Sequence, residues 1–240
     1  MSRIFKGFAL ALSMLTTLPF FKVHDFYKGI NGYAVMFYPL VGLILGFILY
    51  VASLLLEPYV PHFHLGVILF ALWVLLTGAL HLDGFADTVD GLFVPREKAL
   101  EVMKDPHNGG MGMLFGGTFL ILKASSIMAL ESYTLLPLVL LLPRLMIVLL
   151  IYFYSYVSGG MSSLAKEELE SKQVFIAILY SLLFVFLYNS WSLLVGALFI
   201  MLLVKRFFIK RYDGFTGDIY GFTIEIMELL LLNLIIVGLA

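Results

Sequence analysis

The chain has 240 residues, of which 62% are hydrophobic and only 13% are charged. This composition is far too apolar for a soluble domain of that length. It predicts an all-α, polytopic membrane helix bundle that forms a single integral membrane domain over residues 1–240. The formal net charge of −1 gives no general attraction to nucleic acid, and the lack of cysteine excludes disulfides, thiolate metal sites and a cysteine nucleophile.

The first apolar segment covers residues 4–21, with Arg3 before it and Lys6 inside it. It resembles a signal peptide, but no small-residue cleavage site follows, so we expect it to be retained. The two basic residues favour a cytoplasmic N-terminus. The segment would then be a short interfacial or re-entrant stretch and would not span the membrane.

Seven further apolar segments have the length of membrane spans. They cover residues 33–56, 65–80, 111–130, 135–157, 174–188, 191–208 and 219–239. Gly42 and Gly46 stand four residues apart in the first of them, a spacing that predicts close packing of one helix face against a neighbouring helix.

Lysine and arginine occur in every second loop between these segments. They lie in the loops around residues 22–31, 96–104, 166–172 and 205–211, whereas the loops 57–64, 131–134 and 189–190 contain none. The positive-inside rule places the four basic loops in the cytoplasm. The sequence therefore predicts a multi-pass protein of the cell inner membrane whose polar segments, and any active site on them, face the cytoplasm.

Three aspartates, Asp83, Asp87 and Asp90, follow the second of these spans at positions i, i+4 and i+7. If a helix continues through them, they fall within a roughly 60° arc of one helix face. Carboxylates stacked in this way beside hydrocarbon repel one another, and a cation would offset that repulsion. Because magnesium commonly joins carboxylates to substrate phosphates, the pattern predicts a Mg²⁺ site, with a solvated acidic loop as the plainer alternative.

A glycine-rich segment begins at Lys104 and leads directly into the next span. Its Gly109 and Gly110 precede a helix N-terminus, whose free backbone N–H groups and dipole suit a phosphate. We therefore expect Lys104, Asn108, Gly109 and Gly110 to bind substrate, unless the glycines only form a turn between helices.

A third polar segment places Arg211, Gly217 and Asp218 before the last span. Arg211 and Gly217 are further candidates for binding substrate. The general base that phosphoryl transfer to a hydroxyl needs is expected among Asp105, His107 and Asp218.

Four charged residues, Lys123, Arg144, Glu225 and Glu228, lie inside predicted spans. Charges at such positions are costly, so we expect these side chains to face the interior of the bundle. Two interpretations remain open. The cations either neutralise the glutamates or bind an anionic substrate.

Together these segments resemble the cobalamin synthase family, which is adenosylcobinamide-GDP ribazoletransferase. The resemblance covers nearly the whole chain and rests on three motifs: His81-x-Asp83-Gly84-x-Ala86-Asp87-x-x-Asp90-Gly91, Lys104-Asp105 with Gly109-Gly110-x-Gly112, and Thr216-Gly217-Asp218 with Glu225 and Glu228. It implies an integral membrane enzyme that joins adenosylcobinamide-GDP to α-ribazole, or its phosphate, releases GMP and uses magnesium. It also implies a homo-oligomer or a complex with other corrinoid enzymes.

Two other functions fit part of the sequence. Asp87-x-x-Asp90-Gly91 resembles the start of the signature of CDP-alcohol phosphotransferases of phospholipid synthesis, but the rest of that signature is missing. A cation or proton transporter would explain the charges inside the spans. A transporter, however, would have its carboxylates at the membrane midplane and would consist of two halves related by internal symmetry. Here the three aspartates lie at the predicted end of a helix, and no internal repeat is visible.

Overall fold

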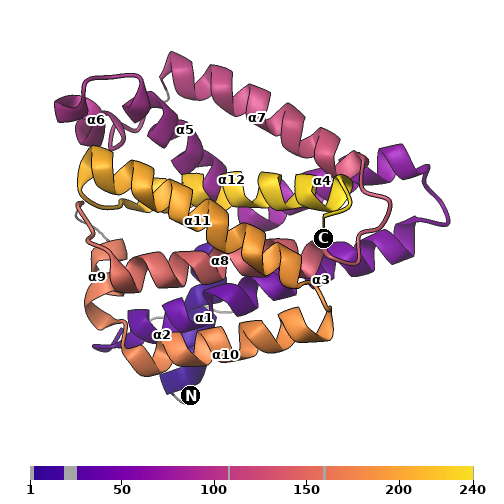
Figure 1. The fold of residues 1–240 in the computed structure, drawn as a ribbon, viewed down its shortest axis with the longest axis horizontal. Coiled ribbons are helices and arrows are strands. Elements are labelled where there is room, and N and C mark those ends of the chain that lie inside the picture. The colour runs from indigo at the N-terminus through magenta and orange to yellow at the C-terminus, as the bar shows by residue number, and fades with distance from the viewer. Residues whose placement is uncertain (1–2, 19–25, 108, 159–160, 240) are drawn as a thin grey trace.

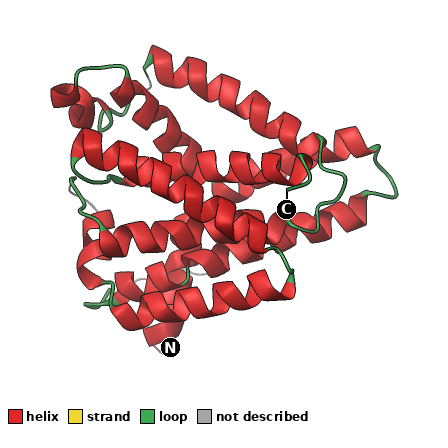
Figure 2. Cartoon of the chain, viewed as in Figure 1, coloured by secondary structure: helices red, strands yellow, loops and turns green. Residues whose placement is uncertain are grey.

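The computed structural model describes residues 3–18, 26–107, 109–158 and 161–239. Figure 2 shows that these residues form helices joined by loops. They contain no strand, only an isolated bridge between Tyr156 and Phe215. The all-α prediction is confirmed.

The described part of the chain contains twelve helices (Figure 1). They are α1 (Arg3–Leu15), α2 (Ile30–Met36), α3 (Tyr38–Leu56), α4 (His62–Thr77), α5 (Leu80–Leu92), α6 (Arg96–Val102), α7 (Gly110–Met128), α8 (Leu136–Phe153), α9 (Met161–Glu168), α10 (Ser171–Leu187), α11 (Trp191–Tyr212) and α12 (Gly217–Ile236).

Five of these helices, α3, α7, α8, α11 and α12, are long and apolar enough to cross a membrane. The pair α4 and α5 is a sixth candidate, bent by 84° at its break. The remaining predicted span corresponds to α10, which has only 17 residues. The multi-pass bundle is confirmed, although the described helices give five or six spans by length and composition where the sequence predicted about seven. The 13 residues of α1 are too few to span a bilayer, in agreement with the expected short N-terminal segment.

The break between α4 and α5 lies at Gly78 and Ala79, whose φ angles are 61° and 57°. This left-handed conformation ends α4, and the N–H groups of the two residues bond back to the carbonyls of Leu75 and Val74. The three aspartates therefore lie on a separate helix, which does not continue the direction of the preceding span.

Three of the predicted cytoplasmic loops lie at the same end of the bundle. Their residues belong to α6, to α9 and to the C-terminal end of α11, and Figure 1 shows these elements together on one side. The structure thus agrees with the alternation of basic and non-basic loops in the sequence.

The centre of the bundle is α8, which is buried along nearly all of its length and packs against α3, α10, α11 and α12. Its contact with α3 is close because α3 presents glycines. A Cβ atom on Gly42 would lie 2.3 Å from the carbonyl oxygen of Leu140, and one on Gly46 would lie 2.4 Å from the Cα atom of Pro137. The small-residue packing predicted from the sequence is confirmed.

Replacing Gly46 with alanine should therefore destabilise the bundle. The added methyl group meets backbone atoms of α8, and overpacking of this kind costs about 1–3 kcal/mol. We expect the midpoint of thermal unfolding in detergent to fall for Gly46→Ala. The matched control is Gly117→Ala on α7, where a Cβ atom would meet nothing within 4 Å. Equal midpoints for the two variants would contradict the close packing of α3 on α8.

Candidate functional site

Small residues hold α5 directly against α12. A Cβ atom on Gly84 would lie 3.0 Å from the Cα atom of Asp218, and one on Gly221 would lie 3.1 Å from the carbonyl oxygen of His81. The two helix backbones are therefore nearly in contact. This approach brings the first and the third polar segments of the sequence to the same place.

Four aspartates gather where these helices meet. The carboxyl group of Asp87 lies within electrostatic range of Asp83, Asp90 and Asp218. Asp83 is exposed, Asp87 and Asp218 are half-buried, and Asp90 is buried. Lys104, a predicted phosphate ligand, is within electrostatic range of Asp218. The structure thus brings the three predicted metal ligands together with one candidate base and one candidate substrate-binding cation.

Asp90 has a partner that sequence reasoning missed. Its Oδ2 atom accepts a hydrogen bond from the N–H of Gly109 at 2.8 Å, and its Oδ1 atom accepts one from Gly112, also at 2.8 Å. Asp90 therefore caps the N-terminus of α7 in the manner that helix N-termini favour. The backbone N–H of Gly109, which we expected to be free for phosphate, is therefore bound by this carboxylate.

Asp90→Ala should accordingly lower the stability of the protein. Loss of a side chain that caps a helix typically costs about 0.5–2 kcal/mol. We expect a lower unfolding midpoint in detergent for Asp90→Ala. Asp87 lies on the same helix but caps no helix among the described residues. Asp87→Ala should therefore leave the unfolding midpoint at or above that of the wild type. A larger loss of stability in Asp87→Ala would contradict the division of roles between the two residues.

The donor atoms at the junction of α5 and α12 fit a magnesium ion that is shared with a ligand. Among the residues that the structure describes, no three His, Cys, Asp or Glu side chains are close enough to hold a metal ion by themselves. Magnesium, however, is usually bound through one or two carboxylates together with substrate phosphates and water. Asp83 and Asp87 provide hard oxygen donors of this kind, whereas both oxygens of Asp90 already accept bonds from α7.

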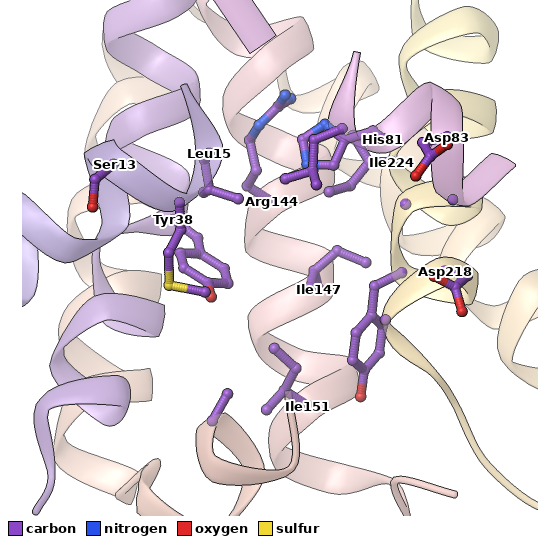
Figure 3. A pocket seen from close by; sticks show the side chains of 17 residues that line it. Ser13, Leu15, Tyr38, His81, Asp83, Arg144, Ile147, Ile151, Asp218 and Ile224 are labelled. Carbon is purple, nitrogen blue, oxygen red and sulfur yellow. The ribbon is translucent and has the colours of Figure 1, made fainter. Parts of the chain in front are cut away.

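A cavity of about 470 Å³ lies beside Asp83 and Asp218 (Figure 3). It is enclosed by α1, α3, α5, α8 and α12, with one residue from α9. Its lining includes the predicted site residues Asp83, Gly217 and Asp218, and also Ser13, Leu15, Tyr38, His81, Arg144, Ile147, Ile151, Tyr220 and Ile224. The aspartates therefore stand at the edge of a mostly apolar cavity of the size that a small organic ligand needs.

Asp105 and His107 lie on the exposed loop between α6 and α7 and are not among the residues that line this cavity. Asp105 accepts a hydrogen bond from the backbone N–H of His107 at 2.9 Å, and this bond lowers the pKa of the Asp105 carboxyl group. A carboxylate with a lowered pKa is a weaker base, so the geometry favours Asp218. Asn108 is outside the described residues.

Arg211 also lies away from the cavity lining. Its guanidinium donates to the carbonyl oxygens of Leu92 at 3.1 Å and Val94 at 3.3 Å, and to the hydroxyl of Tyr212 at 2.9 Å. These bonds fix the C-terminal end of α11 to the loop that follows α5. Arg211 binding to phosphate stays a prediction.

The four charges inside the bundle pair with one another across α7, α8 and α12. The Nζ atom of Lys123 lies 2.6 Å from Glu225 Oε2 and 2.5 Å from Glu228 Oε2. Arg144 pairs through its Nη1 atom with Glu228 and donates from the same atom to the carbonyl of Leu140 at 2.9 Å. Mutual neutralisation, one of the two interpretations of these residues, is therefore what the structure shows.

Glu228→Gln should destabilise the protein strongly because Glu228 is the partner of both cations. Removing one partner of a buried ion pair typically lowers the stability by about 3–5 kcal/mol, because the remaining charge is left uncompensated. We expect a sharply reduced yield of monodisperse protein and a lower unfolding midpoint. Glu101→Gln, at an exposed position on α6, is the matched control. If Glu228→Gln were as stable as the wild type, the charge network would contribute little to the stability of the protein.

Comparison with known proteins identifies the family. The profile of the family described as cobalamin-5-phosphate synthase matches residues 7–236. The chain belongs to this family. The resemblance inferred from the three polar motifs is thus confirmed.

Relatives in this family match over nearly their whole length. The adenosylcobinamide-GDP ribazoletransferase of Desulfitobacterium hafniense (strain Y51) is 34% identical over 239 residues, which cover 93% of each chain. Proteins with the same name from Acinetobacter baumannii (strain ACICU) and Pseudomonas entomophila (strain L48) are 37% and 36% identical, over 96% and 97% of this chain and 97% and 98% of theirs. No solved structure matches the chain.

Proposed function

We propose that the protein joins adenosylcobinamide-GDP to α-ribazole, or its phosphate, to give adenosylcobalamin, or its phosphate, with release of GMP. Membership in the cobalamin-5-phosphate synthase family and the names of the relatives support this activity. The structural observation that carries the proposal is the meeting of Asp83, Asp87 and Asp218 beside a cavity of about 470 Å³. Phosphoryl transfer needs a place where a charged phosphate bridge and a hydroxyl acceptor can meet.

The reaction exchanges one phosphorus–oxygen bond for another. A ribose hydroxyl oxygen of the acceptor bonds to the phosphorus that carries the cobinamide group, while the bond from that phosphorus to the bridging oxygen breaks. GMP leaves with the bridging oxygen. Asp218 takes the proton of the hydroxyl, since it is the candidate base that lines the cavity. Thr216 hydrogen-bonds the Asp218 carboxylate and holds it in place.

Asp83 and Asp87 would hold magnesium together with the pyrophosphate of the substrate. When bound, magnesium supplies positive charge that stabilises the phosphate groups as GMP departs. Lys104, within electrostatic range of Asp218, adds a positive charge on the protein side. The aspartates otherwise repel both one another and the anionic substrate, so the proposed reaction should require the cation.

We assign the site to the cytoplasmic side of the cell inner membrane. The basic loops at one end of the bundle support this orientation through the positive-inside rule. Lys104 lies in one of these loops, and Asp218 lies in the first turn of the helix that follows another. Association with a second copy of the chain or with other corrinoid enzymes stays a prediction from the family.

The proposed function predicts magnesium-dependent release of GMP by the purified protein in nanodiscs. Asp87→Asn should lower turnover by at least about 100-fold, equivalent to about 2.7 kcal/mol of transition-state stabilisation, and EDTA should have a comparable effect on the wild type. Asp213→Asn is the matched control, because Asp213 is exposed and its side chain pairs with Arg96 at the surface. Release of CMP from a CDP-lipid in place of GMP, or wild-type turnover by Asp87→Asn, would overturn the proposal.

A further inference from the structure

The cavity beside Asp83 and Asp218 is lined by residues with buried polar atoms that have no hydrogen-bond partner among the described residues. Arg144 is completely buried, and within the described part of the chain its Nε and Nη2 atoms have no partner. His81 is 4% exposed and its Nδ1 atom is likewise unpaired, as is the hydroxyl of Tyr220, which is 5% exposed. Figure 3 shows the side chain of Arg144 beside that of His81, and the two groups are within electrostatic range of each other.

These unpaired atoms are concentrated at this cavity. Six buried side-chain polar atoms lack a partner among the described residues, and four of them belong to Arg144, His81 and Tyr220, which all line it. An unpaired buried donor costs about 1–3 kcal/mol. A cluster of such atoms around one cavity is therefore typical of a site that a polar ligand completes.

The charge of the surrounding network limits what that ligand can be. Lys123 and Arg144 are balanced by Glu225 and Glu228, so the buried cluster carries no net charge. A phosphate group placed beside Arg144 would add negative charge inside the bundle that nothing nearby compensates. The free Nε–H and Nη2–H edge of Arg144 instead suits an uncharged group with acceptor atoms, such as a ring nitrogen or a ribose oxygen.

The size and the walls of the cavity limit the ligand further. Leu15, Ile147, Ile151 and Ile224 give it apolar walls, which suit a flat base with little polarity. A volume of about 470 Å³ is in the range for a nucleoside. A corrin ring with its amide side chains and attached nucleotide is several times larger and cannot enter.

We infer that this cavity is the binding site of the acceptor nucleoside, with Arg144 as a specificity-determining residue. The base lies between the apolar walls, and the free edge of Arg144 donates to acceptor atoms of the base or ribose. The ribose hydroxyl that reacts then faces Asp218 at the cavity edge, while the phosphates of both substrates stay outside with Asp83 and Lys104. This assignment rests on the proposed function and deepens it, because it separates the places of the two substrates.

The test fills the cavity without touching the charge network. Ile151→Phe places a larger apolar side chain in the space that the base would occupy. Purified wild type and variant in nanodiscs are compared by equilibrium dialysis with α-ribazole alone and by the KM values for α-ribazole and adenosylcobinamide-GDP. We expect Ile151→Phe to weaken α-ribazole binding and to raise its KM by about tenfold or more, with the KM for adenosylcobinamide-GDP unchanged. Ile121→Phe, the same substitution at an exposed position on α7, should change neither.

A second variant examines Arg144 itself. Arg144→Lys keeps a positive charge for Glu228 but removes the planar Nε–H and Nη2–H edge. It should raise the KM for α-ribazole by about tenfold while the KM for adenosylcobinamide-GDP stays the same, which a merely structural role would not produce.

The possible outcomes separate the two proposals. Unchanged α-ribazole binding in Ile151→Phe, or a rise only in the KM for adenosylcobinamide-GDP, overturns the site assignment while the proposed function stands. A third outcome is that the protein binds α-ribazole and Ile151→Phe weakens this binding, but no GMP is released. That outcome supports the cavity as the binding site and overturns the proposed reaction. A wild type that neither binds α-ribazole nor releases GMP overturns both.

Discussion

Two cations and two anions buried among α7, α8 and α12 hold together the part of the bundle on which the site is built. None of these charges is tolerable alone in an apolar interior, so α7, α8 and α12 must meet for Lys123, Arg144 and Glu228 to be satisfied. Among the described residues, the network engages the Nη1 atom of Arg144 and leaves its Nε and Nη2 atoms without a partner.

The position of α5 follows from a second constraint, which is backbone geometry. The left-handed turn at Gly78 and Ala79 ends α4, and α5 leaves this turn at 84° to it. The absence of side chains at Gly84 and Gly221 then lets α5 lie against α12. Because both conditions hold, aspartates more than a hundred residues apart in the chain lie near one another.

Much of this architecture could be predicted from the sequence because it depends on local pattern. Apolar length predicted the helices, the spacing of Gly42 and Gly46 predicted the close contact of α3 with α8, and the isolated charges predicted burial within the bundle. The i, i+4, i+7 spacing also placed the three aspartates correctly on one helix. The family followed from the combination of three polar segments, none of which would have been specific alone.

Other features depend on backbone conformation or on contacts between distant residues, for which a single sequence carries little signal. Ala79 adopts a positive φ although alanine has no preference for it, so the bend in the chain could not be predicted. The bonds of Arg211 to the loop after α5 are equally invisible in a single sequence.

The cap that Asp90 makes on α7 changes how the acidic cluster works. Because Asp90 accepts hydrogen bonds from the backbone N–H groups of Gly109 and Gly112, the acidic helix α5 is tied to the start of α7. The three aspartates looked equivalent in the sequence. In the structure, Asp90 caps α7, whereas Asp83 and Asp87 are the two that a cation could bind. Asp218 adds a further carboxylate from the other side of the junction. In the proposed reaction, a cation shared with the substrate would offset the negative charge that these aspartates place around the proposed phosphate site.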